Sequence, residues 1–332
     1  MYSHSRNGIA VLAVLTFSAF AQEAQLDEVK VISSAIDDRF SSKRQEPSSV
    51  SVISGKKVDD AHAKDITQVL NSVPGVTAEV QSGDSVKIML RGIENQRFMG
   101  EKPGVAIVID GVPVFERTGR VNIDLDNIES IRVIKGGASY LFGEDALSGA
   151  VIITTKRGAK YAGVTVGAEA GSFDYYKRLA RAGAAGEMGS FHLQYADRGS
   201  DDYYDQAQYA STYLAGNGQL YLTGTSDLTF GFEKSDRNKD SHGTVTGKTQ
   251  AEIDPRSMGG GAAGRDYTRK YDVKLDKVNM TYSNDYSEKG NLLLTAYQYD
   301  DHTRYISAPQ RYTLTSGVVT SADAYTNGND YK

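Results

Sequence analysis

The second half of the chain alternates between apolar and small or polar residues in segments of about ten positions. In GSFHLQYADR, residues 189–198, single polar residues separate Phe191, Leu193 and Tyr195. Side chains two positions apart lie on the same face of a strand, so each such segment predicts a β-strand with one apolar face. The same period appears in residues 162–170, 226–234, 277–285 and 290–300. This repetition predicts an antiparallel sheet after Lys156.

Two architectures use such strands, an outer-membrane barrel and a water-soluble sandwich. Connection lengths favour the barrel, because residues 224–227 and 287–290 read as tight turns and residues 236–270 as one long polar loop. Outer-membrane barrels have short turns at one end and long loops at the other. The distribution of tyrosine also favours the barrel. Tyrosine concentrates at lipid–water boundaries, and 19 of the 21 tyrosines follow Lys156. This shift in composition also predicts a domain boundary near residue 157.

The N-terminus carries a pattern typical of a secretory signal. Arg6 precedes an apolar run of 13 residues from Gly8 to Phe20, and the small residues Ala19 and Ala21 flank a cleavage position. A helix that spans a membrane needs roughly 20 apolar residues, so this run is too short. We therefore expect export, with cleavage near Ala21.

Composition excludes several kinds of site. The net charge of −5 argues against nucleic acid as a partner, and the absence of cysteine excludes disulfides, iron–sulfur clusters and thiolate zinc sites. The following histidines are scattered singly, without the spacing of metal ligands: His62, His192, His242 and His302. The neighbouring acids Asp59 and Asp60, like Asp201 and Asp202, lack a nucleophilic or basic partner and are interpreted as solvated loop charge. We expect no enzyme, no bound metal and no cofactor.

The first half reads as a compact α+β unit. Short apolar strands are predicted at residues 49–54, 85–92, 104–114, 131–135 and 149–156. Residues 65–76 predict a helix with an apolar face, capped by Asp65 and ended by Pro74 and Gly75. That face consists of Ile66, Val69 and Leu70.

Two turns complete this unit. Asp110 and Gly111 sit between two apolar runs, which predicts a hairpin. Asp126 and Asn127 are expected to start a brief helical turn before the strand at residues 131–135.

Residues 128–156 place several glycines between apolar runs, a pattern that can also hold a phosphate. A phosphate loop needs lysine and a hydroxyl after its last glycine, whereas Gly143 is followed by Glu144 and Asp145, which repel phosphate. The dinucleotide pattern is absent as well. We interpret three of the glycines as positions of sharp turning or close packing: Gly136, Gly137 and Gly149.

Together these motifs resemble the TonB-dependent outer-membrane receptors. DEVKVIS, residues 27–33, is similar to the family's energy-coupling box, and DITQVLNSVPGV to its plug helix. The segments that then follow in the family's order are IMLRGI, VAIVIDGVPV, IESIRVIKGGASYLFG and ALSGAVIITTK. The chain departs from the usual pattern at Gly137, where proline is common, at Arg132, where an acid is common, and at Ser148 and Ile152 in the last strand.

The resemblance implies an α+β plug domain followed by a transmembrane antiparallel β-barrel in the outer membrane, with the plug and coupling box facing the periplasm. It divides the chain into a signal peptide (1–21), a periplasmic segment with the TonB box (22–46), the plug domain (47–157) and the barrel (158–332). Plugged transporters have about 22 strands. The 176 residues after Lys156 suffice for seven or eight, so we expect an incomplete barrel that does not transport alone.

The resemblance also implies partners. The coupling box would contact the inner-membrane protein TonB, since an extended segment can add as a strand to a partner's sheet edge. These residues are Glu28, Val29, Lys30 and Val31. Outer-membrane lipid would surround the barrel.

Substrate contacts are expected in loops at the plug apex, where arginines beside aromatics suit an anionic ferric chelate. The candidates are Gln96, Arg97, Phe98, Phe115, Arg117 and Arg120. These arginines could instead pair with acidic groups on the barrel wall. Arg91 and Gly92, directly after a strand, are expected to anchor the plug. A ferric siderophore is the expected substrate, with cobalamin or haem as alternative substrates of the same family. A non-transporting, β-rich adhesin is the alternative function.

Overall fold

A computed structural model gives the fold of the chain. It describes residues 17–18, 50–80, 86–94, 104–114, 121, 123–136, 146, 148–205, 207–240, 248–256, 268–287, 290–308, 310–315, 318–324 and 327–331. In these ranges there is no helix of sufficient length and apolarity to cross a bilayer.

The plug unit contains two small sheets. The larger one has the order β2-β8-β9-β6-β7, formed by Val50–Ser54, Ile128–Lys135, Gly149–Thr155, Val105–Ile109 and Val112–Pro113. Strands β6 and β9 are parallel and the other neighbours are antiparallel. The smaller antiparallel sheet has the order β3-β4-β5, formed by Val76–Val80, Val86–Leu90 and Ile93–Glu94.

One apolar core joins these sheets to two short helices, α2 (Gly55–Asp60) and α3 (Ile66–Leu70). The predicted helix is present but shorter than expected, because it ends at Leu70 and not at Pro74 and Gly75. Its predicted cap is confirmed: the Asp65 carboxylate accepts from the backbone N–H groups of Thr67 (2.8 Å) and Gln68 (3.4 Å). Its apolar face is buried in the core as expected. Burial of aliphatic side chains is therefore the main force that holds the plug together.

The two predicted turns are present, one of them shifted. Asp110 and Gly111 have φ of +51° and +79° and connect β6 to β7 as a hairpin. The helical turn is a 3-10 helix, Leu125–Asn127, and it begins earlier than expected. The reason is Asp124, whose carboxylate accepts from the backbone N–H of Asp126 at 2.9 Å and so caps the turn.

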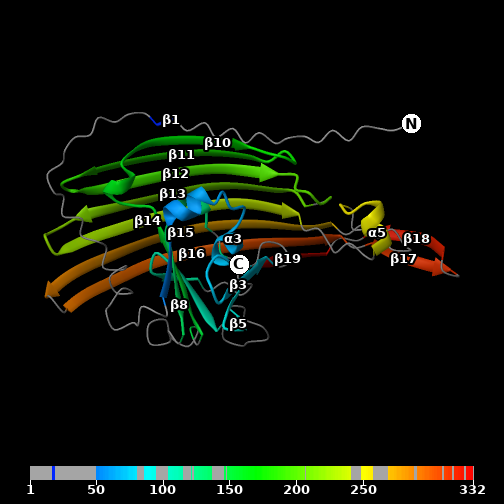
Figure 1. Ribbon diagram of the computed structural model, residues 1–332, viewed down its shortest axis with the longest axis horizontal. Helices are drawn as coiled ribbons and strands as arrows, with labels where there is room; N and C mark the ends of the chain where they lie inside the picture. The colour runs from blue at the N-terminus through cyan, green and yellow to red at the C-terminus, as the bar shows by residue number, and fades with distance from the viewer. Residues whose placement is uncertain are drawn as a thin grey trace.

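After the plug, a 3-10 turn (Ala159–Tyr161) leads into a large antiparallel sheet (Figure 1). Its seven long strands, β10 to β16, follow in chain order as Gly163–Ala170, Tyr176–Gly186, Gly189–Ser200, Tyr209–Tyr221, Ser226–Asp240, Thr268–Ser287 and Gly290–Ala308. The short strands β1 (Phe17–Ser18) and β19 (Asn327–Tyr331) pair with its edges, at β10 and β16. The order is open among the described strands. A separate hairpin pairs β17 (Gln310–Thr315) with β18 (Val318–Ala324).

The predicted alternation is confirmed in these strands. Phe191 and Tyr195 on β12 are 42% and 45% exposed on the outer face, while His192 and Gln194 are 1% and 0% exposed on the inner face. Figure 1 shows the plug elements, in blue to green, lying against one side of the curved sheet. The inner, polar face is therefore the face that meets the plug. The domain limits given above stay a prediction.

The long polar loop is shorter than the predicted residues 236–270. Strand β14 continues to Asp240 and β15 starts at Thr268, and a short helix, α5 (Lys248–Ile253), lies between them. The ends of these strands are polar on both faces, so hydropathy alone did not reveal them. Cross-strand ion pairs support them, Lys274 to Asp236 at 3.4 Å and Lys270 to Asp240 at 3.7 Å.

Candidate functional site

The residues proposed for TonB and for substrate lie outside the described part of the chain. This applies to the whole coupling box, Glu28, Val29, Lys30 and Val31. It applies equally to the apex candidates Gln96, Arg97, Phe98, Phe115, Arg117 and Arg120, and to Gly137. Their roles stay predictions.

The remaining plug candidates cluster around the ends of β4, β8 and β9. Arg91 and Gly92 have φ of +53° and +83°, and Gly136 has φ of +123° with the Arg91 guanidinium 3.8 Å from where its Cβ would stand. Gly149 has φ of +151°, and a Cβ there would lie 2.1 Å from the Ile134 carbonyl oxygen. A side chain at Gly149 would break the contact between β8 and β9. Arg91 is exposed and makes no hydrogen bond within the described ranges, so its anchoring role stays a prediction.

The geometry points instead to a polar interface between the plug and the inner face of the sheet. Its centre is formed by Asp124 and Asp126, at the 3-10 turn, and by Arg198 on β12. Arg198 Nη2 bonds Asp126 Oδ2 at 2.8 Å and also bonds Asp124 Oδ2. Gln194 Nε2 donates to Asp124 Oδ1 at 3.3 Å. One sheet guanidinium thus bridges two plug carboxylates.

Two cations on β11 complete this group. Lys177 Nζ lies 3.3 Å from Asp126 Oδ1 and 2.5 Å from Glu169 Oε1, and Arg181 Nη2 donates to the Asp126 carbonyl oxygen at 2.7 Å. Hereafter the acidic pair Asp124 and Asp126 with Arg198, Lys177 and Arg181 is called the docking cluster. All five side chains are at most 15% exposed. Such burial makes ion pairs strongly geometry-dependent.

The two aspartates differ in their electrostatics. Burial raises the pKa of Asp124, because Arg198 offsets the loss of water only in part. Burial acts in the same sense on Asp126, but the charges of Arg198, Lys177 and Arg181 together outweigh it and lower the pKa of Asp126. Asp126 is therefore the carboxylate that the sheet cations stabilise as an anion.

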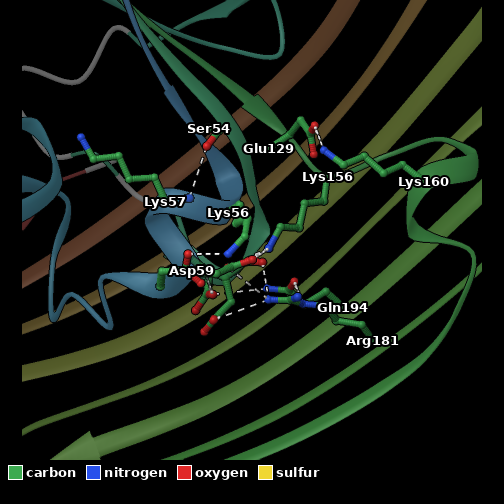
Figure 2. A network of polar contacts seen from close by, with 12 residues as sticks. Ser54, Lys56, Lys57, Asp59, Glu129, Lys156, Lys160, Arg181 and Gln194 are labelled. Carbon is green, nitrogen blue, oxygen red and sulfur yellow. Dashed lines mark hydrogen bonds and ion pairs between the residues drawn. The ribbon is translucent and has the colours of Figure 1, made fainter. Parts of the chain in front are cut away.

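A second ion pair lies beside this cluster, where the plug ends (Figure 2). The Lys156 side chain is 1% exposed and its Nζ donates to both carboxylate oxygens of Asp59, at 2.8 Å and 2.7 Å. Arg181 Nη2 lies 3.8 Å from Asp59 Oδ1. Burial and the charge of Arg181 lower the pKa of Lys156, and Asp59 opposes the shift. Figure 2 also shows the neighbouring pair of Lys160 with Glu129, at 2.7 Å.

Neutral hydrogen bonds extend the contact along β13. Asn217 Nδ2 donates to Thr155 Oγ1 at 3.1 Å and to the Lys156 carbonyl oxygen at 3.0 Å. Asn127 Nδ2 donates to the Tyr213 hydroxyl at 3.2 Å. The sheet thus holds the end of the plug through neutral hydrogen bonds, each of which a water molecule could replace.

The interpretation of the acidic pairs as solvated loop charge was wrong for two members. Asp59 binds the buried Lys156, and Asp202 binds Lys64 at 2.5 Å. Their partners are 97 and 138 residues away in sequence, so no local pattern could identify them. Sequence reasoning also missed Lys177, Arg181 and Arg198. The signal that could have identified them is a basic residue on the polar face of a predicted strand, since that face meets the plug.

No metal site is evident in this part of the molecule: across the described ranges, no group of three or more histidine or acidic side chains is placed to hold an ion. The interface consists of ion pairs and amide hydrogen bonds, which position a domain and do not perform covalent chemistry.

Comparison with known proteins fits this arrangement. Residues 42–150 match the family model described as TonB-dependent Receptor Plug Domain. The chain is 35% identical over 152 residues to the iron-regulated outer membrane virulence protein of Vibrio cholerae, covering 42% of this chain and 22% of that protein. It is 29% identical over 172 residues to the vitamin B12 transporter BtuB of Vibrio vulnificus, covering 49% of this chain and 27% of that protein.

A solved structure shares the fold. The ferric-catecholate import receptor Fiu of E. coli K12 aligns with a TM-score of 0.63 and 18% identity, over 85% of this chain and 43% of that one. These are receptors and transporters, not enzymes. The plug match, the docked plug and the open sheet of long strands agree: residues 42–150 form a plug domain of the TonB-dependent receptor family, and the antiparallel sheet that follows shares the fold of such a receptor, of whose length this chain spans less than half.

Proposed function

We propose that this chain supplies the plug and barrel strands of a receptor that takes up an iron chelate, a ferric siderophore, across the outer membrane, with energy supplied from the inner membrane through TonB. The observation that carries the proposal is the docking of a family plug on the polar face of a barrel sheet through a buried ion cluster. The similarity to an iron-regulated outer membrane protein supports iron as the cargo.

The interface is suited to a plug that shifts when it is pulled. Its contacts are ion pairs and amide hydrogen bonds, and water can replace these when the plug separates from the wall. The apolar core lies within the plug itself, so displacement of the plug need not expose it. The TonB box at residues 28–31 would provide the handle, by adding as a strand to TonB.

The coupling step can be tested in the protein as its own cells produce it. A proline at Val29 removes a backbone donor and fixes φ, so Val29→Pro should abolish uptake of a radiolabelled ferric siderophore while surface binding persists. Val29→Ala is the matched control, because it keeps the backbone donor and should retain most uptake. Unchanged uptake in Val29→Pro would refute the assignment of the box.

Cobalamin is the second candidate cargo, favoured by the similarity to a vitamin B12 transporter. Uptake assays distinguish the two cargoes. Uptake of labelled ferric siderophore and of labelled cobalamin would be compared in the same cells, with and without a protonophore. Protonophore-sensitive uptake of cobalamin alone would replace the iron proposal.

A further inference from the structure

A cavity of about 140 Å³ lies between the plug and the sheet, beside the docking cluster. Its sheet wall comes from β12, β13 and β14 and carries basic and hydroxyl side chains. These are Arg198, Tyr209, Ser211, Tyr213, Ser235, Arg237 and Lys239. Its plug wall is largely aliphatic, formed by Ile66, Val80, Val86, Val121, Ile123 and Leu125. Two plug carboxylates also line it, and both are engaged by protein: Asp65 caps α3, and Asp124 is paired with Arg198. The two walls therefore offer opposite chemistry across one small space.

The basic groups on the sheet wall are not all neutralised by protein. Arg198 is bound to the acidic pair, and Lys64, which also borders the cavity, is bound to Asp202. The Lys239 side chain makes no hydrogen bond or ion pair with the residues that the structure describes, although its backbone is paired within the sheet. It shares the cavity with Lys64 and Arg237, which carry the same charge and whose effect on Lys239 exceeds the opposing effect of Asp65 and Asp202. An anion in the cavity would relieve this repulsion.

One hydroxyl on the same wall is buried without a partner. Ser235 is 4% exposed, it lines the cavity, and its Oγ has no hydrogen-bond partner among the described residues. A buried hydroxyl left unpaired costs free energy, so such groups in folded proteins normally face a ligand or water. Ser235, Arg237 and Lys239 alternate along β14, which places all three on its inner face.

We propose that this cavity binds a small organic anion, with its carboxylate on Lys239 and Ser235 and its apolar body against the aliphatic plug wall. The volume equals several waters at about 30 Å³ each, which suits a compact ligand and not a whole ferric siderophore. The two-sided lining matches the usual design of small-molecule pockets, apolar with a few converging polar groups. The site is independent of the proposed transport function.

The test uses benzoate as the probe, with the full chain in detergent and binding measured by equilibrium dialysis. Benzamide has the same shape without the charge, and acetate has the charge without the ring. The proposal requires benzoate to bind more tightly than both. Equal binding of benzoate and benzamide, or no binding of benzoate, overturns it.

Variants locate the site. Lys239→Met should weaken benzoate binding about tenfold, the usual effect of losing one charge-assisted hydrogen bond, and Lys239→Arg should restore most of it. Ser235→Ala should weaken binding less and leaves the charges intact. Lys234→Met is the matched control on the same strand, because Lys234 lies on the outer face, 68% exposed and paired with Asp276. Weakening in Lys234→Met equal to that in Lys239→Met refutes the assignment, as does unchanged binding in both Lys239→Met and Ser235→Ala.

Discussion

Two kinds of contact hold the plug: apolar packing within its own core, and ion pairs with the inner face of the sheet. In the core, Leu90, Ile131 and Ile153 are 0% exposed among other aliphatic side chains. At the wall, Asp124 and Asp126 meet basic side chains. Apolar burial stabilises without preferred direction, whereas buried ion pairs stabilise only in one geometry. The fold of the plug and its position against the sheet therefore depend on separate forces, which mutations can separate.

The largest effect is expected at Arg198, which bridges both carboxylates. Arg198→Met leaves two buried acids with weaker compensation and should reduce the free energy of docking by about 3–5 kcal/mol. Hydrogen exchange in the whole chain should quicken at residues 123–127 while amides of β9 stay protected. Lys56→Met is the control, because its pair with Asp60 is exposed. Equal loss of protection in β9 would contradict the separation.

The converse change lies in the core. Ile153→Ala deletes buried methyl groups on the central strand β9 and should cost about 2–5 kcal/mol. Here β8 and β9 should lose protection first, since the cavity is inside the plug. Thr77→Ala on β3, an exposed position, should change stability by less than about 0.5 kcal/mol. If β8 and β9 keep their protection in Ile153→Ala, the core does not hold the plug as described.

The pair of Lys156 and Asp59 should respond asymmetrically. Asp59→Ala leaves a buried ammonium without its partner and should cost about 2–3 kcal/mol, whereas Lys156→Met should stay within about 1 kcal/mol because Asp59 is 37% exposed. The folded pKa of Lys156 lies below its ordinary value, so stability rises with pH between the two values. The penalty of Asp59→Ala should therefore shrink toward pH 10 in denaturant titrations. Equal penalties for both variants would argue against this account.

The smallest effect is expected when the pH is lowered and Asp126 becomes protonated. The pKa of Asp126 is lowered, so its contribution is present above the ordinary value of about 3.9 and is lost as the pH falls through the folded value. Docking of the plug, followed by hydrogen exchange, should weaken only in that acid range, by about 1 kcal/mol. Asp126→Asn should remove this dependence. Asp124→Asn should not, because the pKa of Asp124 is raised and acid favours its folded form.

Much of the fold could be predicted because its signals are local. The cap at Asp65, the Asp110–Gly111 hairpin and the alternation around Phe191 each depend on residues within a few positions. The strand ends at residues 236–240 could not be predicted, since polar residues on both faces resemble a loop until the partner strand is known.

The candidate site shows the opposite case. The sequence drew attention to arginines in the apex loops, whereas the described contacts place plug carboxylates against basic residues of the sheet. Asp59 and Lys156 are each unremarkable in their own segments. Only their meeting, 97 positions apart, makes Lys156 a buried cation.

The sequence by itself determined the receptor-type plug, the order of the strands, and which face of each strand is polar, because periodicity and turn residues act over short distances. The tertiary structure alone decided which polar residues pair: the docking cluster, the Lys156–Asp59 pair and the cavity at Lys239. The physical reason is that the energy of a charge depends on its burial and its nearest partner, and both are set by segments far apart in the chain.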